Sequence, residues 1–159
     1  MKLKLAVYNM EWMKNLFYAD GTPKKANVGS ADDRKQGRRS ERLAQVVQAI
    51  DPDVLCIVEG PDTLKDGSKT ASTQLAAWRD LHHLAADYEA VHGIPSGGQQ
   101  ELCALFKKSK IRLVHDPQKK ASTNPFDNFF LVDTMDSLIQ EPSKHYRPPL
   151  EVSLRGPAA

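Results

Sequence analysis

Two polar side chains in the first half of the chain, Asn9 and Glu59, stand where a divalent metal could bind. Glu59 directly follows the apolar run 54–58, and Asn9 closes the segment 3–9. Mg²⁺ accepts oxygen ligands and is often held by one or two carboxylates together with waters and a substrate phosphate. A metal bound in that way can polarise a phosphoryl oxygen and stabilise the leaving oxygen. The spacing alone leaves a second interpretation open, in which Glu59 marks the solvent end of a strand and Asn9 caps a turn.

The run 54–58 is predicted to be a buried strand. Its sequence, Val-Leu-Cys-Ile-Val, is apolar without alternation and rich in β-branched residues, which is typical of a strand covered on both faces. Asp51-Pro52 before it and Gly60-Pro61 after it make a helix unfavourable. In open α/β folds, ligands bind beyond the carboxyl ends of such strands, and Glu59 stands at that end.

The preceding segments predict the rest of a β-α-β unit. Residues 3–9 are typical of a first strand, whereas residues 18–37 lack periodicity and contain glycine and proline, so we expect a loop there. A helix is predicted over residues 41–50, with Ser40 as its cap, because apolar side chains recur at helical spacing. The two strands are then expected to pair in parallel.

Parallel pairing has a consequence for the polar side chains. The carboxyl ends of parallel strands meet at one edge of the sheet. Asn9 and Glu11, which follow the first strand, are therefore expected beside Glu59.

The remainder of the chain adds a second helix and more strands to a fold that we predict to be α/β. The helix is predicted over residues 71–86. Short connectors are expected to join the first three of the later strands as hairpins. These later strands are predicted over residues 88–92, 101–106, 111–115, 129–134 and 149–154.

The composition is that of a soluble globular domain, and 159 residues correspond to about one domain. A net charge of +2 is too small to indicate a nucleic-acid partner by itself. Basic side chains do crowd the region before the predicted first helix. Such a run is usually a solvated loop, or it could face a phosphate backbone. Its members are Lys24, Lys25, Arg34, Lys35, Arg38, Arg39 and Arg42.

No apolar stretch of the sequence is long enough to cross a membrane, and the apolar part of the N-terminus is too short for a signal peptide. Cys56 and Cys103 lie in apolar runs, where a free cysteine acts as a small hydrophobic residue. Their spacing is not that of a metal or redox pair. These features predict a cytoplasmic, reducing setting without a membrane partner.

Several ordered blocks of sequence, spread over nearly the whole chain, resemble one known family. The blocks are Tyr-Asn-Met-Glu-Trp at 8–12, Arg-Leu at 42–43, Asp-Pro-Asp-Val-Leu-Cys-Ile-Val-Glu at 51–59, Gly-Gly-Gln at 97–99 leading into Leu-Cys-Ala-Leu-Phe at 102–106, and Arg-Pro-Pro-Leu-Glu-Val at 147–152. They are similar to the opening motifs of the endonuclease/exonuclease/phosphatase superfamily, the DNase I-like proteins. That resemblance implies a four-layer α/β sandwich, with two mixed sheets face to face and helices outside, that cleaves phosphoester bonds with Mg²⁺ or Mn²⁺.

The resemblance also implies roles for individual residues. Glu59 would be the principal metal ligand, Asn9 would orient the phosphate or the metal's shell, and Glu11 stands where some members place a second acidic residue. Arg147 would approach a substrate phosphate through its forked donors, or it forms an ion pair at the rim. Tyr146 would line the same cleft, or it belongs to a surface loop.

Other motifs of the family are missing from the sequence. The family's general-base Asp, its Asp-x-Asn motif and its C-terminal Asp-His pair have no counterparts here. Residues 1–159 are therefore expected to form the N-terminal portion of such a domain: half of the sandwich, with one mixed sheet and helices on its outer face. Without groups for proton transfer, this chain alone is expected to have little activity.

Half a sandwich would leave an apolar sheet face to be covered. We expect a homodimer or a missing C-terminal half to cover it. The expected substrate is a phosphoester, and the basic run extends that class to nucleic acid. Two other interpretations stay open: a non-catalytic binding module built on the same half-fold, and an unrelated α/β domain whose strands imitate the motifs.

Overall fold

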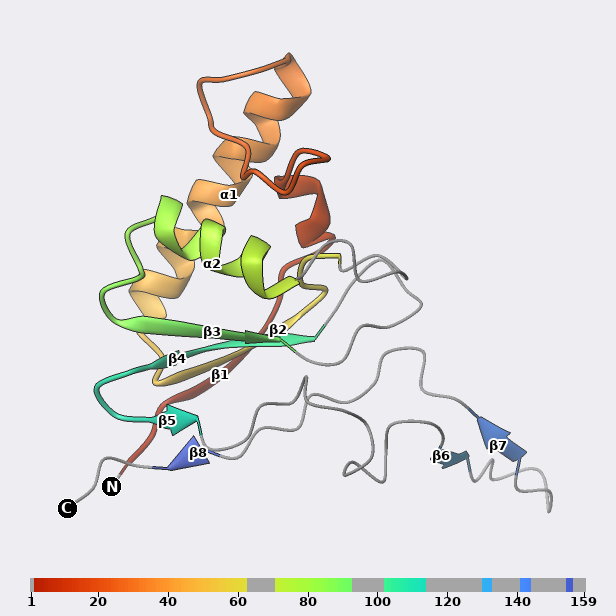
Figure 1. Cartoon of the computed structure of the whole chain (residues 1–159), viewed down its shortest axis with the longest axis vertical. Coiled ribbons are helices and arrows are strands. Elements are labelled where there is room, and N and C mark those ends of the chain that lie inside the picture. Colours follow the sequence, from red (N-terminus) through yellow and green to blue (C-terminus); the bar gives the residue numbers. More distant parts are fainter. Residues whose placement is uncertain are drawn as a thin grey trace.

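The fold is seen in a computed structural model, which describes residues 2–62, 71–92 and 102–113 and the short segments 130–132, 141–143 and 154–155 (Figure 1). The larger elements alternate between strand and helix, which confirms the predicted α/β class. Their bounds are β1 Leu5–Asn9, the 3₁₀ helix η1 Met13–Leu16, α1 Ala31–Ile50, β2 Val54–Val58, α2 Ala71–Leu81, β3 Tyr88–His92 and β4 Cys103–Lys107. The short strands are β5 Arg112–Leu113, β6 Phe130–Val132, β7 Glu141–Ser143 and β8 Leu154–Arg155.

The central element is a four-stranded mixed sheet in the order β1-β2-β4-β3. Strands β1 and β2 run parallel, as predicted, with a register that pairs Leu5 with Val54 and Asn9 with Val58. Strand β4 lies antiparallel to both β2 and β3, so the predicted hairpin of β3 and β4 is also confirmed. Among the described helices, none is long and apolar enough to cross a membrane.

One face of this sheet carries both α-helices (Figure 1). Leu55 and Ile57 of β2 are almost fully buried there in one cluster with Val47 of α1 and with Leu75 and Trp78 of α2. Burying side chains of this size stabilises the fold by about 1.5–3 kcal/mol each. The same cluster takes in the turn after β1, which fixes the carboxyl end of that strand against the helices.

The opposite face is covered unevenly. Val54, Val91 and Phe106 are buried there in a second cluster, but Leu5 and Val7 of β1 are 69% and 75% exposed. Cys56, which pairs with Val7, is exposed as well. The prediction that residues 54–58 are covered on both faces is therefore wrong at Cys56, because it lies next to the edge strand β1.

Helix α1 begins ten residues before the predicted start, and the predicted loop over 18–37 is correspondingly too long. Ser30 caps the helix: its hydroxyl accepts from the amide of Asp33, whose carboxylate accepts from the amide of Ser30. This capping box satisfies backbone donors that a helix start leaves open. Most of the basic run thus lies on a helix instead of in a loop. Gly37 in the helix interior packs against the backbone of segment 25–26.

We predicted that Ser40 would cap this helix. It is instead a buried residue in the middle of α1. The indole Nε1 of Trp78 donates to its hydroxyl at 2.9 Å, and the hydroxyl lies 2.7 Å from Nε2 of His82. Burial, with a smaller contribution from His83, lowers the pKa of His82. The neutral ring can therefore accept a hydrogen bond from the hydroxyl of Ser40. The Trp78 Nε1, the Ser40 hydroxyl and the His82 Nε2 then all have partners between the two helices.

Two other boundaries differ from the predictions. Helix α2 ends at Leu81, short of residue 86, because His83 takes a left-handed conformation with φ of 58°. The amides of His83 and Leu84 then bond back to the carbonyls of Asp80 and Arg79, which is the pattern of a Schellman end. Strand β5 does not form the predicted hairpin with β4. It pairs with β8 instead, since β2 and β3 already occupy both edges of β4.

A candidate metal centre at the carboxyl edge of β1 and β2

The parallel pair brings Asn9 and Glu59 together. Asn9 and Val58 form the last register pair of β1 and β2, and the amide of Met10 extends the pairing to the carbonyl of Val58 at 2.9 Å. Just beyond it, the Nδ2 of Asn9 donates to Oε1 of Glu59 at 3.4 Å. The side chains that the sequence placed at one sheet edge are thus neighbours.

The main chain after β1 also holds the Glu59 carboxylate. The amide of Trp12 donates to its Oε2 at 2.9 Å, and the amide of Met13 donates to the Glu59 carbonyl at 3.1 Å. The Oδ1 of Asn9 accepts from the amide of Glu11 at 2.8 Å. Both oxygens of the carboxylate are therefore oriented by neighbours, and the group stays partly open to solvent.

The backbone at this edge is strained. Glu11, Trp12 and Glu59 have φ values of 45°, 57° and 59°. A left-handed conformation costs a residue with a side chain about 1–2 kcal/mol. Such strain persists where surrounding contacts impose it, and it gathers at functional sites. Three strained residues around one carboxylate therefore mark this edge as a candidate site.

Arg39 of α1 supports the strained turn, a role that the sequence did not suggest. Its Nη2 donates to the main-chain carbonyls of Met10 and Glu11. Had the helix been predicted to begin at residue 31, Arg39 would have been expected on the same face as buried Leu43, one turn before it. The capping box at Ser30 was the signal for that longer helix.

The donor set fits a metal that takes few protein ligands. Within the residues that the structure describes, no three His, Cys, Asp or Glu side chains lie close enough together to hold an ion. Glu59 supplies a carboxylate and Asn9 an amide oxygen, and the exposed Glu11 stands beside them. Mg²⁺ keeps several waters and needs one or two carboxylates with substrate oxygens, so these residues suit it better than they suit Zn²⁺, which takes nitrogen and sulfur ligands.

The remaining predicted site residues cannot be placed. Arg147 and Tyr146 lie outside the described residues, and their proximity to Glu59 stays a prediction.

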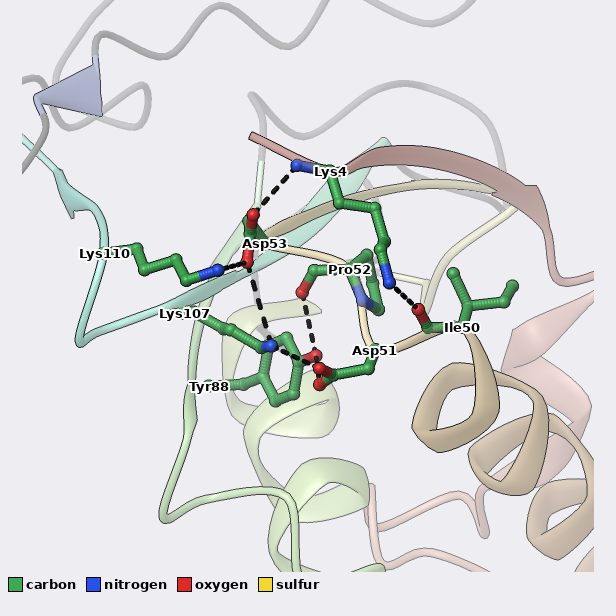
Figure 2. A network of polar contacts seen from close by, with 8 residues as sticks. All are labelled: Lys4, Ile50, Asp51, Pro52, Asp53, Tyr88, Lys107 and Lys110. Atoms are coloured by element: carbon green, nitrogen blue, oxygen red, sulfur yellow. Dashed lines mark hydrogen bonds and ion pairs between the residues drawn. The ribbon is translucent and has the colours of Figure 1, made fainter. Parts of the chain in front are cut away.

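The other acidic residues of the 51–59 motif belong to a separate network at the opposite end of β2 (Figure 2). The carboxylate of Asp53 accepts from the ammonium of Lys110 and from the backbone amide of Lys4, both at 2.8 Å. Lys107 pairs with Asp51 at 2.7 Å. These groups tie the starts of β1 and β2 to the end of β4.

The pairing of Asp53 also affects the pKa of its carboxyl group. The hydrogen bond from Lys110, aided by the amide of Lys4, holds the pKa of Asp53 below its usual value. The side chain of Asp53 is almost fully buried. Its charge is balanced by the ammonium of Lys110 and the amide of Lys4. It therefore serves the fold, which leaves Glu59 as the acidic residue of this motif that faces the candidate site.

The four-stranded mixed sheet carries both α-helices on one face. No family model and no curated protein matches the chain. Among solved structures, the chain is similar to an endonuclease/exonuclease/phosphatase from Bacteroides vulgatus, with 14% identity and a TM-score of 0.41. The match covers 71% of this chain and 34% of that one, so the chain spans about a third of that structure's length.

Proposed function

We propose that this chain supplies the metal-holding part of a Mg²⁺-dependent phosphoester hydrolase of the endonuclease/exonuclease/phosphatase type. The observation that carries the proposal is the contact between Asn9 and Glu59 across the ends of two parallel strands. The strained turn that holds the carboxylate from the other side adds to it.

Each residue has a distinct part in this proposal. Glu59 is the principal ligand of the ion, and Asn9 orients either the phosphate or the shell of the ion by its amide. Glu11 extends the acidic character of the edge. When bound, Mg²⁺ supplies positive charge to the phosphoryl oxygens and the leaving oxygen. Arg147 and Tyr146 are proposed to meet the substrate phosphate.

The proposal assigns no residue of this chain to proton transfer. A general base and a group that protonates the leaving oxygen each contribute about 10²–10⁴-fold to such reactions, and the sequence holds no Asp-x-Asn or Asp-His motif. We therefore propose that turnover needs a second polypeptide surface. It would cover the open side of the sheet at Leu5 and Val7, either as a C-terminal half or as a second copy of this chain.

The missing motifs also favour a second candidate function. The same half-fold could serve as a binding module that keeps its surface and performs no chemistry. The two functions differ at Glu59, because a binding module has no need for a metal at this carboxylate.

Calorimetric titration of Mg²⁺ tests the proposal. Glu59→Gln keeps the size of the side chain and removes its charge, so we expect it to weaken Mg²⁺ binding by more than about tenfold, the range seen when even supporting residues are lost. Glu89→Gln is the matched control, because Glu89 is exposed on β3 and lies level with Val54 at the opposite end of the sheet. Equal Mg²⁺ affinity in the wild type and Glu59→Gln would refute the proposed site.

A further inference from the structure

The exposed face of α1 carries a stripe of basic side chains. Lys35, Arg38 and Arg42 follow one another at spacings of three and four residues, which places them on one face of the helix. All three are exposed. The nearest carboxylates along the helix, Asp32 and Glu41, form no ion pair with any described residue. The stripe therefore creates a local positive potential, although the net charge of the chain is only +2.

The basic stripe borders the candidate metal centre. Arg39 lies four residues after Lys35 and three before Arg42, so it stands at the edge of the stripe. Its guanidinium donates to the main-chain carbonyls of Met10 and Glu11, in the turn whose next amide holds the carboxylate of the candidate metal centre. A polyanion that lies along the stripe would therefore pass close to that centre.

An exposed aromatic side chain in the same turn indicates which polyanion fits. Trp12 is 46% exposed, its amide is fixed on Glu59 at 2.9 Å, and the ammonium of Lys14 lies over its ring at 5.0 Å from the centroid. A basic surface next to an exposed ring is the arrangement on which the bases of single-stranded nucleic acids stack. An anionic membrane would instead need large apolar side chains along the helix, and residues 34–42 contain none.

We propose that the basic stripe of α1 and Trp12 together bind single-stranded nucleic acid. The phosphates lie along Lys35, Arg38 and Arg42, and an unpaired base stacks on the exposed part of the Trp12 ring. Contacts to phosphates carry no sequence information, so the surface is expected to bind without sequence preference. This binding needs no metal. The idea that the bound strand presents its scissile phosphate to Glu59 rests on the proposed function.

The test of the stripe is a titration of dye-labelled oligothymidylate with the whole chain, followed by fluorescence anisotropy in EDTA, which prevents metal-dependent cleavage. The double variant Arg38→Gln/Arg42→Gln keeps good helix formers on an exposed face. We expect it to weaken oligothymidylate binding by about tenfold or more. The slope of log affinity against log salt should also become shallower by about 1.4, or about 0.7 for each lost phosphate contact.

The test of the ring uses Trp12→Leu. This variant should weaken oligothymidylate binding about tenfold, the equivalent of one stacked base, and leave the affinity for inorganic polyphosphate, which has no bases, unchanged. Intrinsic fluorescence gives a second readout, because the only other tryptophan, Trp78, is fully buried. Quenching by oligothymidylate therefore reports stacking on Trp12 and should disappear in Trp12→Leu.

Two controls separate this proposal from general charge effects and from the metal site. Lys2→Gln/Arg112→Gln removes the same charge from exposed side chains outside the stripe and should bind oligothymidylate nearly as tightly as the wild type. Glu59→Gln loses a negative charge and should bind it without metal at least as tightly, so failure of Mg²⁺ binding would leave this surface's role intact. Equal affinity in the wild type and either the stripe variant or Trp12→Leu, an equal loss in the charge control, or binding of duplex DNA or anionic vesicles as tight as that of the single strand would each overturn the proposal.

Discussion

Replacing Gly37 by alanine should destabilise the protein, although the same change stabilises most helices. In a helix interior, alanine is favoured over glycine by about 1 kcal/mol. At Gly37, however, an added Cβ would lie 2.2 Å from the carbonyl carbon of Lys25 and 2.4 Å from the amide nitrogen of Ala26. Both neighbours are backbone atoms, so no side chain can rotate away to make room.

The size of the effect follows from that geometry. Ordinary contact distances begin at 3.4 Å, so α1 and segment 25–26 must separate by about 1 Å. Overpacking of this kind costs about 1–3 kcal/mol or more. Because Arg39 follows Gly37 by about half a turn of the same helix, the shift also displaces its guanidinium relative to the carbonyls of Met10 and Glu11. Because the clash is with backbone atoms, we take the upper end of that range, about 3 kcal/mol, and subtraction of the helix-propensity gain of about 1 kcal/mol leaves a net loss of about 2 kcal/mol.

Urea unfolding of the wild type and Gly37→Ala measures this difference. Gln45 lies exposed in the same helix. The difference in the free energy of unfolding between Gln45→Ala and Gln45→Gly therefore measures the helix propensity of alanine relative to glycine in α1, without any packing change. If Gly37→Ala stabilised the protein by as much as that pair differs, helix α1 would not approach segment 25–26 so closely.

Three further predictions concern the fold and its assembly. Ser40→Ala leaves the buried indole of Trp78 without an acceptor and should lower the free energy of unfolding by about 2 kcal/mol in urea titrations; an unchanged value would contradict the network between the helices. Because the pKa of Asp53 is lower in the folded state, its contribution to stability is present above the usual value of 3.8 and is lost as the pH falls below it. Asp53→Asn should therefore flatten the fall in stability in that pH range, and an equally steep fall would contradict the pairing. If a second copy covers the open sheet face, sedimentation should find a dimer in the wild type and a monomer in Val7→Glu, since Val7 is 75% exposed on that face; a monomeric wild type would exclude this occupant.

The sequence was sufficient to predict the sheet edge because the signals there are local. The unbroken apolar run 54–58 between breaking residues indicates a buried strand, and one helix between two strands requires them to run parallel. These two facts place Asn9 beside Glu59 without knowledge of any contact. The strained turn was invisible to the same reasoning, because Glu11 and Trp12 are not residue types that favour a left-handed backbone.

The first half of α1 could not be found from hydrophobic periodicity. Its buried positions before Leu43 are Gly37 and Ser40, which are small residues that pack against a backbone segment and an indole instead of filling an apolar core. Their pattern looks polar throughout. The pairing of β5 was also beyond local signals, because it depends on both edges of β4 being occupied already.

The most direct measurement for the proposed metal centre is paramagnetic broadening by Mn²⁺, which can replace Mg²⁺ at oxygen ligands. We predict that substoichiometric Mn²⁺ broadens the amide signals of Glu11 and Trp12, which bond to Asn9 and Glu59, and that Glu59→Gln abolishes this broadening. The amide of Lys107, which bonds to the carbonyl of Asp53 at the opposite end of the sheet, should stay sharp. Broadening centred on Lys107, or broadening of Glu11 and Trp12 that persists in Glu59→Gln, would contradict a metal centre at Glu59.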